Sequence, residues 1–174
     1  MVNHGLIPMS RQSILNFSQA VRRALHIADT ERFVDVVRIL EHIIPTLYPD
    51  FTLEVLAKRE MGEDHGLTYP KRHLILLRED VYEGACHGKG RDRFTVAHEM
   101  GHLLMHEDID PRYARREDGV EIPRYLDPEW QSDAFAGYFL MSPKAIVGLD
   151  ARQVAAACGV SPEAARVQLS VIKK

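Results

Sequence analysis

The chain has 174 residues, of which 45% are hydrophobic and 27% are charged, and its formal net charge is −3. This length and composition predict one globular domain, and the weak negative charge excludes a broad positive field that would attract nucleic acid or a membrane surface. The two cysteines, Cys86 and Cys158, lie in unrelated contexts, so we expect free thiols in a reducing, cytoplasmic environment. No run approaches the roughly 18 apolar residues that span a bilayer, so no membrane partner is expected.

Two amphipathic helices are predicted near the start of the chain. Residues 10–26 have apolar residues at helical spacing behind Ser10, which is a suitable N-cap. Residues 31–44 show the same spacing after Asp29, which can cap the second helix. That helix should end near Pro45, because proline cannot continue a helix.

Three short strands are expected next, because the apolar period changes. Residues 51–58 alternate, and residues 65–69 and 73–79 form two further β-type runs separated by residues 70–72. A small antiparallel or mixed sheet should therefore precede the histidine-rich part of the chain. We expect residues 73–79 to form an edge strand of that sheet.

Two helices are predicted after the sheet. Asp80 and Glu83 have the spacing of a capping box for a short helical turn. The glycines of residues 87–93 break that turn and allow a longer helix over residues 91–106.

The rest of the chain is predicted to be a long loop followed by three helices. Residues 107–128 are charged and contain prolines, which favours a loop. Residues 129–142 follow as a helix, with an apolar face of Trp130, Ala134, Phe135, Tyr138 and Met141. The tail, residues 150–172, should form two short helices around a turn, with Ser161 as N-cap and Pro162 at the first helical position of the second.

The longest predicted helix contains the pattern HExxH. His98 and His102 are four residues apart, so they lie on one helix face about 6 Å apart along the axis and can bind one metal ion. Glu99 points towards the same cavity, where a carboxylate can accept a proton from a metal-activated water. The pattern predicts a hydrolytic metal site.

Such a site needs a third protein ligand, and Glu129 is the candidate. Glu129 and Asp133 are spaced i and i+4, so Glu129 can bind the metal while Asp133 accepts a hydrogen bond from the far nitrogen of a ligand histidine. His106 lies too far along the helix to share the ion, so we expect it to line or support the site. Zinc is the preferred ion, although manganese or another divalent ion suits the same donors. Asp108 stands where a metzincin would have its third histidine, so the sequence excludes the metzincin subclass for this chain.

The segments RFTVAHEMGHLLMH and EWQSDAFAGYFLMSP resemble the ImmA/IrrE family of bacterial metallo-endopeptidases. The resemblance covers roughly residues 50 to 170, including the Cys158-Gly159-Val160-Ser161 turn. Ser132, Asp133 and Ser142 depart from the residues usual in the family, and of these only Asp133 bears on the chemistry. The resemblance implies a zincin-like fold and cleavage of regulatory proteins, often helix-turn-helix repressors.

These expectations define an α+β fold with an HExxH helix against a small sheet. We expect a single metallopeptidase domain over residues 1–174, made of N-terminal helices (1–48), a zincin-like core (50–142) and a helix-turn-helix-like pair (150–172). The expected partner is a protein or peptide substrate. Candidate transition-state donors are Tyr113, Arg124, Tyr125 and Tyr138.

Two rival functions remain open at this stage. The C-terminal pair has the look of a helix-turn-helix, so the chain is alternatively a DNA-binding regulator. Arg166 and the terminal Lys173 and Lys174 offer little positive charge, and Ala164 and Ala165 little to read bases, so we regard nucleic acid as an unfavoured partner. A toxin–antitoxin component with a structural or weakly active metal site is the other alternative.

Overall fold

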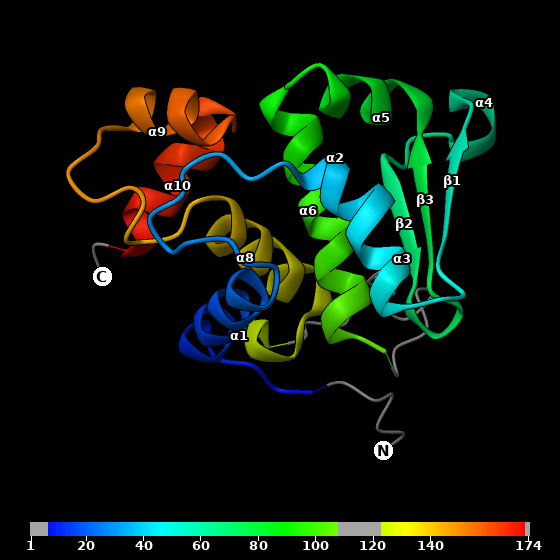
Figure 1. Ribbon diagram of the computed structural model, residues 1–174, viewed down its shortest axis with the longest axis horizontal. Helices are drawn as coiled ribbons and strands as arrows, with labels where there is room; N and C mark the ends of the chain where they lie inside the picture. The colour runs from blue at the N-terminus through cyan, green and yellow to red at the C-terminus, as the bar shows by residue number, and fades with distance from the viewer. Residues whose placement is uncertain (1–6, 108–122, 173–174) are drawn as a thin grey trace.

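The computed structural model describes residues 7–107 and 123–172 of the chain. A small sheet lies on one side of a central helix, and further helices lie on the other side (Figure 1). The central helix, α6, spans Gly90–Met105 and packs against strand β2 of the sheet and against helices α5 and α8. The fold is of the α+β class, and a small mixed sheet packed on an HExxH helix is the arrangement of the zincins.

The sheet has three strands in the order β1-β3-β2. β1 (Thr52–Leu56) pairs parallel with β3 (Leu74–Arg78), and β2 (Gly66–Tyr69) pairs antiparallel with the other edge of β3. The three predicted strands are confirmed, but the prediction that residues 73–79 form an edge strand is wrong. β3 is central because its side chains are apolar and largely buried on both faces, which suits a strand with a neighbour on each side.

The first predicted helix is confirmed as α1 (Arg11–Ala24), where the Ser10 side chain accepts a hydrogen bond from the Ser13 N–H. The second is shifted. Its helical backbone begins with α2 (Val36–Arg38), and the cap is Asp35 rather than Asp29.

This second helical segment ends near Pro45, as predicted, but it includes the proline. A π-helical turn (Ile39–Ile43) follows α2, and α3 (Ile44–Leu47) then carries the helix past Pro45. A proline in a regular α-helix would clash with the carbonyl four residues earlier. The wider π turn relieves that clash, so the chain remains helical to Leu47.

Two short helices border the sheet. α4 (Lys58–Met61) follows β1 and was not predicted. α5 (Glu79–Cys86) confirms the predicted helical turn, but the capping box is wrong, because the N-cap is Arg78 and no side chain caps the helix. Asp80 instead accepts hydrogen bonds from the Arg78 guanidinium at 2.6 Å and 3.0 Å, and Arg78 also joins β3 to the Gly62 carbonyl.

Helix α8 (Pro128–Leu140) packs against both α6 and α1 and lies at the centre of the hydrophobic core. A short 3-10 turn (Arg124–Leu126) precedes α8. The side chain of Asp127 caps α8 by accepting a hydrogen bond from the Glu129 N–H. Because neighbours surround the helix, its buried residues extend around it and include Ala136, Phe139 and Leu140 besides part of the predicted face. Trp130 and Ala134 are only half-buried.

The predicted C-terminal pair is confirmed as α9 (Ala151–Cys158) and α10 (Pro162–Ile172). Gly159 adopts a left-handed conformation with φ of +62°, and Ser161 caps α10 by accepting from the Ala164 N–H. Arg93 of α6 is 2% exposed and donates hydrogen bonds to the carbonyls of Gly159 and Val34, both at 2.8 Å. This arginine therefore ties the C-terminal pair to the core.

Several sequence-based predictions concern residues outside the described ranges, namely Asp108, Tyr113, Lys173, Lys174 and most of the predicted loop. Both cysteines are free, Cys86 exposed and Cys158 buried. Among the helices that the structure describes, none combines the length and the hydropathy needed to cross a membrane.

Candidate metal centre

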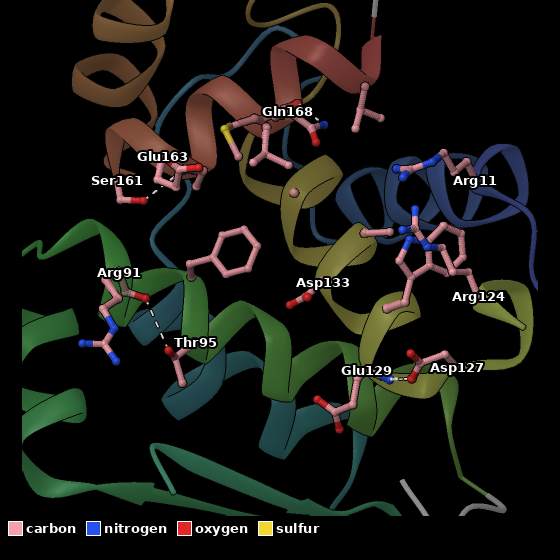
Figure 2. A pocket seen from close by; sticks show the side chains of 18 residues that line it. Arg11, Arg91, Thr95, Arg124, Asp127, Glu129, Asp133, Ser161, Glu163 and Gln168 are labelled. Carbon is pink, nitrogen blue, oxygen red and sulfur yellow. Dashed lines mark hydrogen bonds between the residues drawn. The ribbon is translucent and has the colours of Figure 1, made fainter. Parts of the chain in front are cut away.

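Three ligand atoms converge between α6 and α8. The Nε2 atoms of His98 and His102 are 3.0 Å apart, and each lies 3.3 Å from a carboxylate oxygen of Glu129. The α-helical spacing places both imidazoles on the α8-facing side of α6. The cap at Asp127 begins α8, so Glu129 lies in the first turn of that helix (Figure 2). The donor atoms of these three residues all lie within 4.8 Å of one another, so one ion could contact all of them.

His98 is oriented by Asp133, one turn after Glu129 on α8. Its Nδ1 lies 2.8 Å from Oδ1 of Asp133. A carboxylate can only accept, so Nδ1 carries the hydrogen and Nε2 presents its lone pair to the centre.

His102 is oriented by a longer chain of hydrogen bonds. The amide nitrogen of Gln131 donates to the carbonyls of Ile7 (2.9 Å) and Tyr125 (2.8 Å), so its amide oxygen must face His106. His106 Nε2 donates to that oxygen at 2.8 Å, which leaves its Nδ1 as an acceptor 3.1 Å from Nδ1 of His102. In its neutral form His102 therefore carries its hydrogen on Nδ1 and, like neutral His98, turns a bare Nε2 towards Glu129.

Burial reinforces this assignment at His106, which is 3% exposed. Burial, together with the charge of His102, lowers the pKa of His106 to about 4, although the hydrogen bond to Gln131 opposes the shift. His106 is therefore neutral at pH 7 and can act as donor on one nitrogen and acceptor on the other. It supports His102 from the side away from the three converging donors.

Two imidazole lone pairs and a carboxylate facing one another require a positive charge between them. A proton on Nε2 of His98 is one such charge: burial lowers the pKa of His98, but hydrogen bonds to Asp133 and Glu129 outweigh it and raise the pKa to about 10, and a metal ion would replace that proton. Burial raises the pKa of Glu129, but hydrogen bonds from His102 and His98 outweigh it and bring the pKa far below its ordinary value. The cluster thus favours a cation, and two imidazoles with one carboxylate are a set that zinc accepts in hydrolytic sites.

Glu99 is 6% exposed and lies between α6 and strand β2. The Thr68 hydroxyl is 2.6 Å from Oε2 of Glu99 and is its donor, while the other oxygen, Oε1, faces Gly66. A Cβ at Gly66 would lie 2.6 Å from Oε1, so only glycine lets β2 approach the carboxylate this closely. The carboxylate borders a small cavity that His98, Asp133 and Gly66 also line.

The candidate transition-state donors do not gather at this cluster. Tyr138 is 6% exposed and belongs to the hydrophobic core, and Tyr125 is 52% exposed. Arg124 lines a larger groove next to the centre, and Tyr113 lies outside the described residues.

Sequence reasoning missed three residues that contact the predicted ones: Gly66, Thr68 and Gln131. Gln131 lies between the two predicted acidic residues on α8, and a polar residue inside an apolar helix is a weak signal that a buried partner exists. No local pattern marks Gly66 or Thr68, because their contacts with Glu99 depend on how the sheet packs on α6.

The chain matches a known family model over most of its length. The M78 peptidase family model, described as an IrrE N-terminal-like domain, matches residues 51–170, a range that runs from β1 into α10 and includes His98, His102 and Glu129. A search of curated proteins gave no match.

Proposed function

This chain belongs to the M78 family of peptidases with an IrrE N-terminal-like domain, and from that premise we propose that it is a zinc-dependent endopeptidase acting on a protein substrate. The observation that carries the proposal is the convergence of His98, His102 and Glu129 beside the carboxylate of Glu99. Peptide hydrolysis by metal-activated water needs this combination of an ion site and an adjacent general base.

His98, His102 and Glu129 would hold the ion, which when bound supplies Lewis acidity and activates water at neutral pH. Glu99 accepts the proton of the attacking water and delivers it to the leaving amine. Because Thr68 occupies Oε2, the proton is carried on Oε1. Asp133 and the His106–Gln131 pair hold the two imidazoles in the tautomers that metal binding needs.

The substrate backbone would pair with β2, the edge strand beside Glu99, rather than with residues 73–79. The Arg78 N–H donates to the carbonyl of His65, which lies opposite Arg78 in the register. The next residue of β2, Gly66, therefore forms no backbone hydrogen bond with its partner Leu77 on β3. By the alternation of antiparallel pairing, the peptide groups of Gly66 and Thr68 then face the open edge. An extended peptide can bond to them without its sequence being fixed.

The substrate class follows from the family resemblance. A regulatory protein, such as a helix-turn-helix repressor, is the proposed target, and the chemistry described here would act on any extended segment that such a protein exposes.

Metal analysis of the purified protein tests the proposal. We expect about one zinc ion per chain in the wild type and a loss of zinc in His102→Ala and Glu129→Ala, since three protein ligands are needed for a hydrolytic site. His42→Ala, which removes an exposed histidine of the π turn, is the matched control and should keep its zinc. Glu99→Gln should also keep the ion while losing peptidase activity, and it can then trap the substrate.

Two results would contradict the proposal. A wild-type protein that binds no divalent metal would show that the histidines are structural. A Glu129→Ala variant that binds zinc as tightly as the wild type would show that the third ligand is another residue.

The rival DNA-binding function rests on the α9–α10 pair. In that pair Arg166 is engaged by Glu163 of the same helix, and α10 packs against α8 through buried residues such as Gln168. These contacts favour a unit that closes the domain. A salt-dependent gel shift with duplex DNA would revive the DNA-binding function.

A further inference from the structure

A groove of about 670 Å³ lies along α8, directly beside the metal centre. One face of α8 lines it, and α6 and α10 form its walls (Figure 2). Its apolar lining includes Phe94, Trp130, Ala134, Val167 and Val171.

The groove is adjacent to the cavity at the candidate catalytic residues. Phe94, Thr95 and Asp133 line both spaces. A chain that passes over Glu99 therefore lies next to the groove.

The direction of β2 indicates which part of a substrate would enter. Antiparallel pairing, the more stable arrangement, makes a bound peptide run from the Tyr69 end of β2 to the His65 end. Thr68 contacts Glu99, whereas Nε2 of His65 lies 2.9 Å from the Arg91 guanidinium in the first turn of α6. The segment after the scissile bond thus leaves Glu99 towards Arg91 and passes Phe94 and Thr95, which line both the cavity and the groove.

Two arginines of the groove are available to pair with an acidic segment, whereas its carboxylates already have partners. Its four carboxylates are all engaged: Asp127 caps α8, Glu129 contacts His98 and His102, Asp133 holds His98, and Glu163 pairs with Arg166. Arginines stand at both ends of the groove, Arg91 at one end and Arg11 with Arg124 at the other (Figure 2). Within the described part of the chain, Arg11 and Arg124 form no ion pair, and Arg11 lies 5.1 Å over the ring of Trp130.

We propose that this groove binds the substrate segment on the carboxyl side of the scissile bond and selects a bulky apolar side chain accompanied by an acidic residue. The inference rests on the proposed peptidase function and adds a sequence preference to it. The apolar side chain lies against Ala134, Trp130 and Val167, and the acidic side chain pairs with one of the groove arginines.

The test is cleavage of a proteome-derived peptide library by the zinc-loaded full-length protein, with the new termini read by mass spectrometry. Wild type should cut before Leu, Ile, Met or Phe and enrich acidic residues in the following segment. Ala134→Trp on the floor and Val167→Trp at the rim each fill the groove. Each variant should lower the rate of cleavage before bulky residues about tenfold relative to the rate before Gly or Ala. The reason is that the introduced tryptophan excludes the apolar side chain of the substrate from the groove.

Charge reversal tests the second half of the preference. Arg11→Glu and Arg124→Glu should each weaken the enrichment of acidic residues, and together they should remove it. Arg152→Glu, on the exposed face of α9, should leave both preferences unchanged.

The failures of the two ideas are distinguishable. Cleavage without a preference after the bond, or with a preference unchanged in both tryptophan variants, would overturn the groove inference and leave the peptidase function intact. A zinc-loaded wild type that cuts no peptide would overturn the peptidase function and the groove inference with it.

Discussion

The Thr68 hydroxyl donates a 2.6 Å hydrogen bond to Oε2 of Glu99, across the contact between β2 and α6. Thr68 is 4% exposed, and its hydroxyl also lies 3.2 Å from the backbone carbonyl of Glu99. A buried carboxylate held at one oxygen has little freedom to rotate. The other oxygen, Oε1, lies next to Gly66 and is the one that would accept the proton of the attacking water.

Replacing Thr68 with valine should slow catalysis without removing the metal. The substitution keeps the shape of the side chain and deletes the hydroxyl, and a hydrogen bond to a charged group contributes about 1.5–3 kcal/mol. We expect kcat to fall about 10- to 100-fold. Thr68→Ser keeps the hydroxyl and should retain most of the activity. Equal kcat values for Thr68→Val and wild type would show that Glu99 is positioned by other contacts.

Gly66→Ala should impair the same carboxylate by collision. The new Cβ would lie 2.6 Å from Oε1 of Glu99, so either the carboxylate or β2 must move. Because misplacing a catalytic group by about 1 Å can cost about 100-fold, we expect kcat/KM to fall by that order while zinc content stays at the wild-type level. Steady-state kinetics and metal analysis on the same sample measure both. An unchanged kcat/KM would mean that Glu99 is not the general base or that β2 adapts freely.

Gln131→Leu should weaken metal binding although Gln131 contacts no ligand atom of the centre. Leucine cannot hold His106, so the tautomer of His102 is no longer fixed. Loss of such an outer hydrogen bond typically lowers metal affinity 10- to 100-fold. Competition with a zinc chelator measures the affinity, and Ser132→Ala, the adjacent buried residue of α8, is the control. Equal affinities of Gln131→Leu and wild type would remove Gln131 from the site.

The sequence was sufficient to place the converging donors because their geometry is local. His98 and His102 are brought together by one helix, and Glu129 and Asp133 by another, so helical spacing determines each pair. Only the packing of α6 against α8 does not follow from helical spacing. It depends on the hydrophobic core, and the family resemblance was the basis for expecting it.

The incorrect predictions concern properties that depend on non-local packing. The order of strands cannot be read from three short apolar runs, so β3 was assigned to an edge although it is central. The second helix is expected to end near Pro45 and does end at Leu47, but it includes the proline because a π turn accommodates it, and nothing in the residues around Pro45 signals that turn. Gln131 and Thr68 acquire their roles only through partners distant in the sequence.

The buried histidine His106 should make the metal-free protein less stable in acid. Its pKa is about 4 in the folded protein and 6.5 ordinarily, so between these values the unfolded chain binds more protons than the folded one. Its contribution to stability is therefore complete above pH 6.5 and is lost as the pH falls towards 4, by an amount on the order of 3 kcal/mol. In His106→Asn the difference in unfolding free energy between pH 6.5 and pH 4 should be smaller than in wild type. His42→Asn, at an exposed site, should not change that difference; if both variants behave like wild type, His106 titrates normally.

Arg93 is the residue whose loss should detach the C-terminal pair. Its guanidinium lies 4.0 Å over the ring of Phe33 and donates to the carbonyls of Val34 and Gly159, so Arg93→Met leaves one buried and one partly buried acceptor without this donor. At about 1–3 kcal/mol for each unsatisfied group, we expect a loss of about 3 kcal/mol, or roughly 6–12 °C in Tm. Arg152→Met, at an exposed position of α9, should change Tm by no more than about 2 °C. Amide hydrogen exchange shows which part of the variant is destabilised: amides of α9 and α10 should lose protection before those of α6 and α8. Uniform loss of protection throughout the chain would mean that Arg93 stabilises the whole core rather than the attachment of the pair.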